Sequence, residues 1–300
     1  MNQKYKKTEI SPIIKEQIEL IEEIFNIIQK QISDIEAMGK GIVLPDEIED
    51  LKRTKVLQTK YSYLKTFNEI VQFLLGELKK EESGRFKFYL PNIRTLLEVY
   101  ARLIYLCSKD ENQQMAMCAA NLLFTLAHTI QEPGRDAAER VKVSYEGVRE
   151  SYKENYLYFK PFLDRENIDI PRDIKDFSGN RLKNLGLDFP PVDKMLNKEL
   201  IEHYCPETTR AYPKIAETIY STYRFTSNYI HGNVLTLGTH GKEKLWIIAK
   251  TQILSNLIVD LVNTKVTNNS RKTELIKWMR EVNVKKPRFV EFWLKDNINS

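Results

Sequence analysis

The sequence predicts an all-α fold. Along most of its 300 residues, apolar side chains recur at the spacing of a helix, and the strict alternation typical of strands is scarce. Prolines and glycines stand where helices would begin and end, as Pro213 and Gly232 do around one of them. Hydrophobic residues make up 42% of the chain, which is enough to build a sizeable buried core.

The first segment predicts two antiparallel helices. Ser11 and Pro12 have the residue types of a helix N-cap and first helical position. Apolar residues then follow on one helical stripe: Ile14, Ile18, Ile21, Phe25 and Ile28. A second long helix follows the segment LPDEIEDL and runs toward Lys80. We therefore expect residues 1–85 to form a helical hairpin packed on the core.

Residues 86–269 are expected to form the helical core. Its first helix begins at Pro91, and the next, in the segment NQQMAMCAANLLFTLAHTIQE, is rich in small side chains that allow close helix approach. A third helix is expected over roughly residues 136–159. Helical spacing resumes at DKMLNKELIEHYC, a last core helix covers about residues 245–266, and residues 270–300 form a helical tail.

The periodicity breaks down between residues 160 and 193. Prolines and glycines punctuate this stretch, which is too long for a simple connector in a compact domain. We expect a long loop that is either functional or a mobile insertion. Within it, the segment SGNRLKNLG predicts one short helical turn beginning at Ser178.

Cysteine usage and motifs exclude several classes of protein. Cys107, Cys118 and Cys205 form no C-x-x-C pair, so neither a disulfide framework nor a zinc site is indicated. No glycine-rich phosphate loop, HExxH motif or G-x-S-x-G motif occurs. We therefore expect no cofactor and no metal. The formal charge of +5, from 46 basic and 41 acidic residues, permits RNA binding without requiring it.

The sequence also indicates a cytoplasmic protein. The N-terminus lacks the apolar core of a signal peptide, and the three unpaired cysteines suit a reducing compartment. The most apolar later segment, LWIIAKTQILSNLIVDLV, is interrupted by four polar residues: Lys250, Gln252, Asn256 and Asp260. That segment is expected to be a buried helix and not a membrane span.

The segment TYRFTSNYIHGN carries the candidate site. It ends a helix of about five turns, Lys214 to His231. The stripe of this helix that faces the core consists of Ile215, Ile219, Thr222, Thr226 and Tyr229 with Ile230. Arg224 and His231 are seven residues apart, which places their side chains about 20° from each other on one face of that helix. Tyr220, Ser227 and Asn228 lie between or beside them. This polar face points away from the apolar stripe by well over a right angle.

An arginine and a histidine on one face suit phosphodiester chemistry. The imidazole can move a proton to or from a ribose hydroxyl near neutral pH. The guanidinium can hold phosphate oxygens through two hydrogen bonds as negative charge builds on phosphorus. Such a site needs no metal ion.

The stretch Arg224 to His231 resembles the R-x(4–6)-H signature of HEPN domains, all-helical bundles of RNA-cleaving toxins, defence effectors and noncatalytic relatives. The wider pattern is similar to uncharacterised HEPN-like families that carry an early R-x-x-x-E helix, here Arg94 and Glu98. Those families also carry a tyrosine, a serine and a histidine at four-residue steps, here Tyr223, Ser227 and His231. The resemblance covers about residues 92–266.

The resemblance implies roles for particular residues. His231 would be the general acid or base, and Arg224 would bind the phosphate and the transition state. In the RNA-cleaving members, these two residues from two protomers meet at a dimer interface, and the neighbouring 2′-hydroxyl cleaves the RNA without a metal. Those families favour a polar residue directly after the arginine, whereas this sequence has Phe225.

Two interpretations of Arg94 and Glu98 stay open. Charged residues at four-residue steps are typical of a solvated helix surface, where each pair contributes a few tenths of a kcal/mol. Alternatively, the apolar residues around them bury this face against the His231 helix, and Glu98 orients Arg224 or His231.

The sequence thus predicts an HEPN-like, metal-independent endoribonuclease or toxin-like effector in bacterial antiviral defence, acting as a homodimer on RNA. A neutralising partner protein, or antitoxin, would suit such an effector. The alternatives are a noncatalytic HEPN-like module that binds a partner protein, nucleotide or RNA, and a helical scaffold without a small-ligand site.

Overall fold

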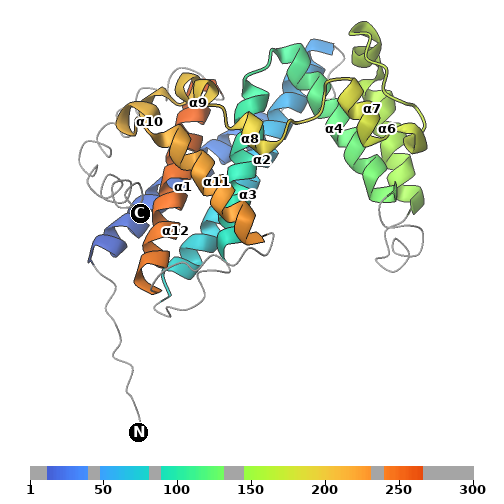
Figure 1. The fold of residues 1–300 in the computed structure, drawn as a ribbon. Coiled ribbons are helices and arrows are strands. Elements are labelled where there is room, and N and C mark those ends of the chain that lie inside the picture. Colours follow the sequence, from blue (N-terminus) through green and yellow to red (C-terminus); the bar gives the residue numbers. More distant parts are fainter. Residues whose placement is uncertain (1–11, 40–47, 81–88, 132–144, 231–239, 266–300) are drawn as a thin grey trace. The chain divides into compact units, whose positions relative to one another are not determined.

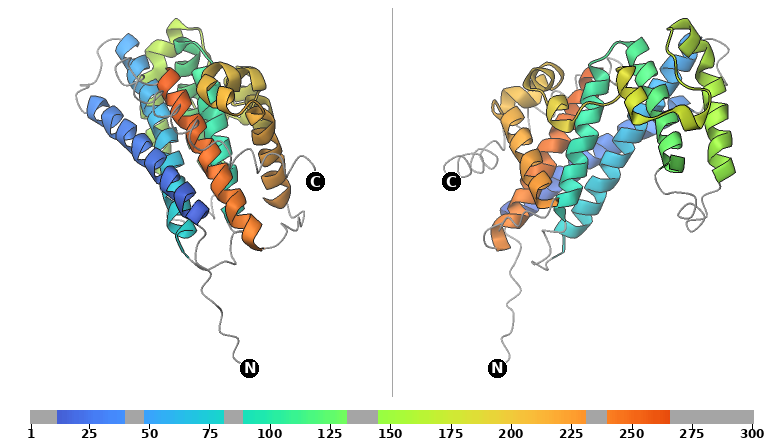
Figure 2. Two further views of the ribbon diagram at one scale, coloured as in Figure 1. Left: turned by 90° about the vertical axis from the view of Figure 1, so that its left-hand side faces the viewer. Right: turned by 45° about the vertical axis from the view of Figure 1, so that its right-hand side comes forward.

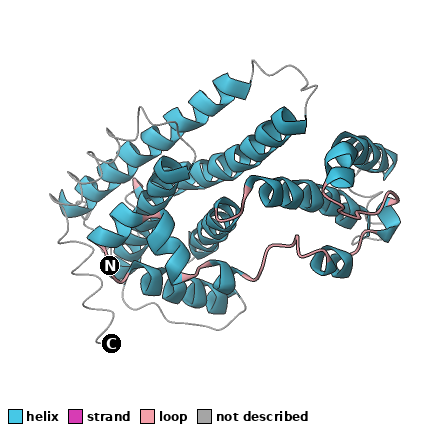
Figure 3. Cartoon of the chain, turned by 90° about the horizontal axis from the view of Figure 1, so that it is seen from above, coloured by secondary structure: helices cyan, strands magenta, loops and turns pink. Residues whose placement is uncertain are grey.

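The structure, a computed structural model, describes residues 12–39, 48–80, 89–131, 145–230 and 240–265. Within these ranges the regular elements are helices, and no strand occurs (Figure 3). The predicted all-α class is confirmed. The expected C-terminal tail, residues 270–300, lies outside the described residues, as does the predicted N-cap Ser11.

The chain divides into two compact units that are not continuous in sequence. Among the described residues, unit 1 comprises 12–36, 61–80, 89–105, 191–230 and 240–265, and unit 2 comprises 37–39, 48–60, 106–131 and 145–190. The ranges predicted from the sequence were serial: 1–85, 86–269 and 270–300. The observed division differs in two ways. α2 (Ile48–Leu78) supplies its first part to unit 2 and the remainder to unit 1, and the stretch of the expected core between residues 106 and 190 belongs to unit 2.

Within unit 1, α1 (Pro12–Gly39) runs antiparallel to the second part of α2. Asn68 Nδ2 donates a hydrogen bond to Gln29 Oε1 at 2.7 Å, and Lys79 pairs with Glu22. The residue number falls along α1 as it rises along α2, so the predicted antiparallel pairing is confirmed. α1 begins at Pro12 as predicted, and Ile18, Ile21 and Ile28 of the expected stripe are buried, whereas Phe25 is only half-buried.

The next unit 1 helices are α3 (Leu90–Cys107), α8 (Val192–Met195), α9 (Lys198–Tyr204), α10 (Pro206–Ala211), α11 (Ile215–Ile230) and α12 (His240–Lys265). In Figures 1 and 2, α12 runs with α1 and α2 on one side and α9 to α11 on the other. From Trp246 to Val262, every described side chain of α12 except that of Lys250 is buried. The prediction of a buried helix is confirmed, and no helix among the described residues has the length and apolarity to cross a bilayer.

Asp260, which is 1% exposed on α12, joins this helix to the short helix α10. Thr208 N–H donates to Asp260 Oδ2 at 2.8 Å, so a side chain from another helix satisfies an N-terminal amide of α10. Burial raises the pKa of the Asp260 carboxyl to about 6, while the donors of α10 act in the opposite direction. Nearby, Tyr100 Oη lies 3.3 Å from Cys205 Sγ inside the same core.

Unit 2 packs α4 (Glu111–Gln131) against α6 (Tyr145–Arg165), with η2 (Ile174–Asp176) and α7 (Gly179–Asn184) over them. Phe159, Phe162 and Phe177 are completely buried. Small residues of α4, such as Ala119 and Ala120, are also buried and allow the close approach that the sequence predicted.

The long loop expected over residues 160–193 begins later than predicted. α6 continues through Pro161 to Arg165, because Phe162 and Leu163 are buried in the unit 2 core and hold the last turn in place. Asn167 then ends the helix at φ 54°, with Ile168 N–H bonded to Leu163 O at 2.9 Å.

The short helical turn predicted at Ser178 is confirmed. The Ser178 side chain accepts from Arg181 N–H at 3.3 Å and caps α7, which begins at Gly179. The stretch between α6 and α9 therefore contains three short helical elements, and only its connections are irregular.

Candidate functional site

α11 turns one side toward the unit 1 core. Ile215, Ile219, Thr222 and Thr226 are buried, as the predicted stripe required. The two threonine hydroxyls need no partner outside the helix, because Thr222 donates to Thr218 O at 2.6 Å and Thr226 to Thr222 O at 3.0 Å. Among the described residues, no hydrogen bond or ion pair joins α11 to another helix.

The opposite side of α11 is open to solvent. Arg224 and Asn228 are exposed, Ser227 is half-buried, and Tyr220 is 41% exposed. In the described part of the chain, Arg224 and Asn228 make no hydrogen bond or ion pair. The prediction of an outward-facing polar face is therefore confirmed for Tyr220, Arg224 and Asn228. His231 lies outside the described residues, so its alignment with Arg224 stays a prediction.

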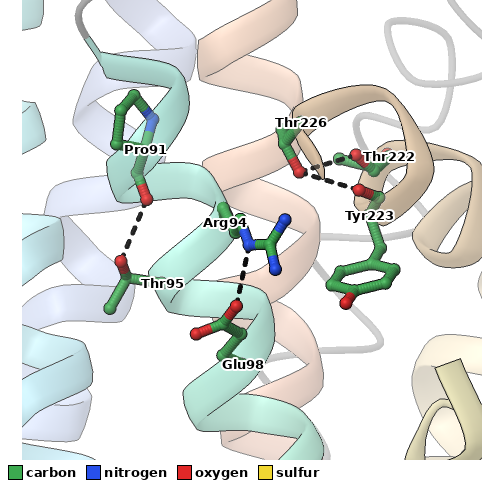
Figure 4. Close-up of polar contacts among 7 residues, drawn as sticks. All are labelled: Pro91, Arg94, Thr95, Glu98, Thr222, Tyr223 and Thr226. Carbon is green, nitrogen blue, oxygen red and sulfur yellow. Dashed lines mark hydrogen bonds and ion pairs between the residues drawn. The ribbon is translucent and has the colours of Figure 1, made fainter. Parts of the chain in front are cut away.

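One flank of α11 contacts α3 through Tyr223. The Arg94 guanidinium carbon lies 5.1 Å from the centroid of the Tyr223 ring, and Arg94 Nε donates to Glu98 Oε1 at 2.8 Å (Figure 4). A cation held over an aromatic face is attracted by the ring quadrupole. The structure thus brings together three of the predicted supporting residues, Arg94, Glu98 and Tyr223, beside the exposed face and not on it.

The hypothesis that Glu98 orients Arg224 is not supported. Within the described ranges, the partner of Glu98 is Arg94 on its own helix, and Arg224 has none. The Arg94 side chain is 18% exposed and its Nη1 is buried without a hydrogen-bond partner. Glu98 therefore neutralises the partly buried positive charge of Arg94. A role beside His231 stays untested.

The other flank of α11 contacts α12 through Phe225. The ring centroids of Phe225 and Trp246 are 5.3 Å apart, and Lys250 Nζ lies 5.5 Å from the Trp246 centroid. Burial lowers the pKa of the Lys250 amine to about 8. Phe225 is thus an interhelical packing residue, which accounts for an aromatic side chain directly after the candidate arginine. The cluster of Phe225, Trp246 and Lys250 was not predicted as part of the site. Its signal in the sequence was Lys250, a lysine inside an apolar segment.

Arg224 supplies the chemistry on this face. Its guanidinium offers five N–H donors in a planar fork that matches two oxygens of a phosphate, and no neighbour in the described structure occupies them. The Asn228 amide, one turn further on, adds a neutral donor and acceptor. No group of three or more potential metal ligands occurs among the described residues.

Unit 2 has a separate hollow of about 550 Å³ beside α6, which the sequence analysis did not identify. Three of its lining residues are basic (Arg149, Lys153 and Arg172), three are acidic (Glu146, Glu150 and Asp173), and two are Tyr152 and Ile174. Tyr152 is buried, donates to Pro171 O at 2.5 Å, and has a raised pKa because of that burial. The balanced charges favour neither an anionic nor a cationic ligand.

The described residues define an all-helical protein whose candidate site is one solvent-facing helix side carrying an unpaired arginine. In comparisons with known proteins, no family model, no curated protein and no solved structure matches the chain.

Proposed function

We propose that the exposed face of α11 binds RNA and is one half of the active site of an HEPN-like, metal-independent endoribonuclease. The observation that carries this proposal is Arg224, an exposed arginine without a partner in the described structure, on the side of α11 opposite its buried stripe. Because its guanidinium has no partner among the described residues, no existing ion pair or hydrogen bond has to break when a phosphate binds.

The proposed reaction is an internal transfer on the RNA chain. The 2′-hydroxyl oxygen of one ribose attacks the adjacent phosphorus, and the bond from phosphorus to the 5′-oxygen of the next nucleotide breaks. His231 accepts the 2′-hydroxyl proton or protonates the leaving 5′-oxygen, in the role that the resemblance implies. Arg224 holds the nonbridging oxygens as their charge grows. The products are a 2′,3′-cyclic phosphate and a 5′-hydroxyl.

A second copy of the chain would complete the site. Proton transfer to one ribose oxygen and from another needs groups on both sides of the phosphorus, and one helix face presents its polar groups from one side only. Two copies that meet through α11 would surround the phosphate with two arginines and two histidines. This is the homodimer that the resemblance implies.

The biological setting follows from the resemblance alone. RNA cleavage by a toxin-like effector in bacterial defence would arrest the cell that the effector acts in. A neutralising partner or antitoxin would then be needed to keep the enzyme silent, and covering the exposed face of α11 is the simplest way to do so.

One observation favours a second candidate function, a noncatalytic HEPN-like module that binds RNA. The position after Arg224 belongs to Phe225, which packs against Trp246, whereas the RNA-cleaving families favour a polar residue there. A face that has lost this polar group could still hold phosphates through Arg224 without cleaving the chain.

The test compares RNA cleavage by the wild type, Arg224→Ala and His231→Ala in the presence of a chelator, with the product ends identified. Loss of one group that stabilises the transition state lowers the rate by about 100- to 1,000-fold, so both variants should lose cleavage to that extent. Arg210→Ala is the matched control, because Arg210 is an exposed arginine of α10 in the same unit and is paired with Glu207.

Cleavage that is unchanged in both variants would contradict the nuclease proposal, as would products with 3′-hydroxyl ends. RNA binding that depends on Arg224 without cleavage by the wild type would support the noncatalytic module instead.

A further inference from the structure

We propose that Tyr220 forms a base-binding subsite on the same face of α11, so that the RNA taken by this site is unpaired where it crosses the helix. This inference rests on the proposed function, because it names the form of RNA that the face accepts. Tyr220 is 41% exposed and makes no ring contact or hydrogen bond within the described structure.

Helix geometry places Tyr220 in line with the candidate arginine. Tyr220, Arg224 and Asn228 follow one another at four-residue steps, so each is displaced from the last by about 6 Å along the helix axis and about 40° around it. All three are exposed, and their side of α11 lies opposite Ile219 and Thr222, which are buried. An aromatic ring, a guanidinium and an amide therefore form one continuous strip.

The three side chains match the parts of a nucleotide. An exposed tyrosine ring offers a flat apolar surface on which a base can stack, and an arginine one turn away can bind a phosphate of the same strand. In a duplex, both faces of each base are covered by the neighbouring pairs, and the deep major groove of an RNA helix is too narrow for side chains. Only an unpaired base presents a free face to Tyr220.

Tyr220 differs from the other large apolar residues that are exposed in the described structure. Phe73 on α2 is 50% exposed, but its ring packs edge-on against Tyr89 at a centroid distance of 6.0 Å. Leu157 on α6 is also 50% exposed and has no ring. Tyr220 is thus an exposed aromatic residue with no partner ring, one turn from an unpaired arginine.

The test measures binding of a labelled RNA strand whose 2′-hydroxyls are methylated, so that it cannot be cleaved. The same sequence is measured single-stranded and annealed to its complement, with the wild type, Tyr220→Ala, Tyr220→Phe and Tyr220→Trp. Since stacking on one aromatic residue contributes about 1–3 kcal/mol, Tyr220→Ala should weaken single-strand binding about 5- to 150-fold. Phenylalanine and tryptophan should restore the affinity to within about threefold of the wild type, because each keeps a flat ring.

Phe73→Ala is the matched control for removal of an exposed aromatic ring, and it should leave RNA affinity unchanged. Binding of the duplex should be weaker than that of the single strand and insensitive to Tyr220→Ala. Single-strand affinity that is unchanged in Tyr220→Ala would overturn the subsite, as would an equal loss for single strand and duplex.

The sedimentation of each variant separates the subsite from a contact between two copies. If Tyr220→Ala dissociates a dimer of the wild type, the ring belongs to the interface between copies and the inference fails. The failures of the two proposals are also distinguishable. RNA binding that depends on Arg224 but not on Tyr220 would remove only the subsite. Binding that depends on both, with no cleavage by the wild type, would remove only the nuclease.

Discussion

The helices α11 and α12 both carry polar residues at one-turn steps, yet they place them in opposite surroundings. On α11, Arg224 and Asn228 are exposed, and the buried polar residues are threonines bonded to carbonyls of their own helix. On α12, polar residues with longer or more strongly polar side chains are buried, including Asn256 at 2% and Asp260 at 1% exposure.

The two helices also differ in how their polar atoms are satisfied. Four buried polar atoms of α12 have no hydrogen-bond partner in the described structure: Thr251 Oγ1, Gln252 Oε1, Ser255 Oγ and Asn256 Nδ2. A buried polar atom that gives up its hydrogen bonds to water without replacing them lowers stability. α12 is therefore part of the buried core that stabilises unit 1, whereas the exposed side of α11 is available for function at little cost to the stability of the fold.

The largest expected effect is a difference in the free energy of unfolding between a substitution in buried α12 and one on the exposed side of α11. Leu257 on α12 is completely buried, so Leu257→Ala should lower the free energy of unfolding by about 2–5 kcal/mol. Arg224→Ala removes an exposed side chain that has no partner among the described residues, so it should change the free energy of unfolding by less than about 0.5 kcal/mol. Chemical denaturation of both variants measures the contrast. A comparable loss in Arg224→Ala would show that this face is part of the stabilising structure.

The next effect concerns Asp260 and pH. Its pKa rises from 3.8 to about 6 on folding, so the folded protein binds more protons than the unfolded chain between these values. Stability from this group is therefore present at low pH, falls as pH rises through about 4 to 6, and is constant above that window. Ionisation costs the fold about 3 kcal/mol.

Asp260→Asn removes this ionisation and keeps an oxygen for Thr208 N–H. Relative to the wild type, the free energy of unfolding of the variant should therefore improve by about 2 kcal/mol between pH 4 and pH 7. Urea denaturation at a series of pH values measures this difference. A difference that does not vary with pH would mean that Asp260 ionises normally.

A smaller difference in stability is expected when the hydroxyl group of a buried threonine is removed from each of the two helices. Thr226→Val on α11 removes a hydroxyl that is hydrogen-bonded, and Thr251→Val on α12 removes one that is not, with the side-chain shape retained in both. We expect Thr226→Val to cost about 0.5–1.5 kcal/mol, and Thr251→Val to be neutral or to stabilise by about 1 kcal/mol. Equal effects of the two substitutions on thermal unfolding would mean that the Thr251 hydroxyl is also satisfied.

The smallest effect concerns the ion pair beside the candidate site. Glu98→Gln removes the charge that pairs with Arg94 and keeps a hydrogen-bond acceptor, so we expect a loss of less than about 1 kcal/mol in stability. RNA cleavage should change less than twofold, since Glu98 has no contact with Arg224 within the described ranges. A large loss of cleavage with stability intact would instead place Glu98 beside His231, as the sequence hypothesis proposed.

Several helix boundaries could be predicted because interactions between residues that are close in the sequence determine them. Pro12 at the start of α1 and Ser178 before α7 act through backbone bonds within a few residues, and both predictions held. Pro161 led to a wrong prediction of the end of α6, because a local rule takes no account of tertiary packing. A proline alone favours a helix end, whereas the burial of Phe162 and Leu163, which depends on distant parts of unit 2, keeps the helix intact.

The candidate site could be predicted in part. The outward side of α11 followed from the positions of Ile215 and Ile219, because a helix places its apolar stripe toward the core. The pairing of Arg94 with Glu98 and the contact of their face with α11 were both among the open interpretations, but the sequence could not decide between them. The contact of Phe225 with Trp246 was not predicted, since it depends on which helices lie beside α11. Nor could spacing in the sequence predict that unit 2 is built from two separate stretches of the chain.

The absence of polar bonds between α11 and the other described helices has a mechanical consequence. Hydrogen bonds fix an orientation, because they weaken steeply when donor and acceptor turn away from each other. The ring of Phe225 on Trp246 and the guanidinium of Arg94 over Tyr223 are contacts between broad surfaces, which change gradually with small rotations. Within unit 1, the position of α11 along and around its own axis is therefore determined by the packing of these surfaces and the attraction between Arg94 and the Tyr223 ring, and not by directional hydrogen bonds.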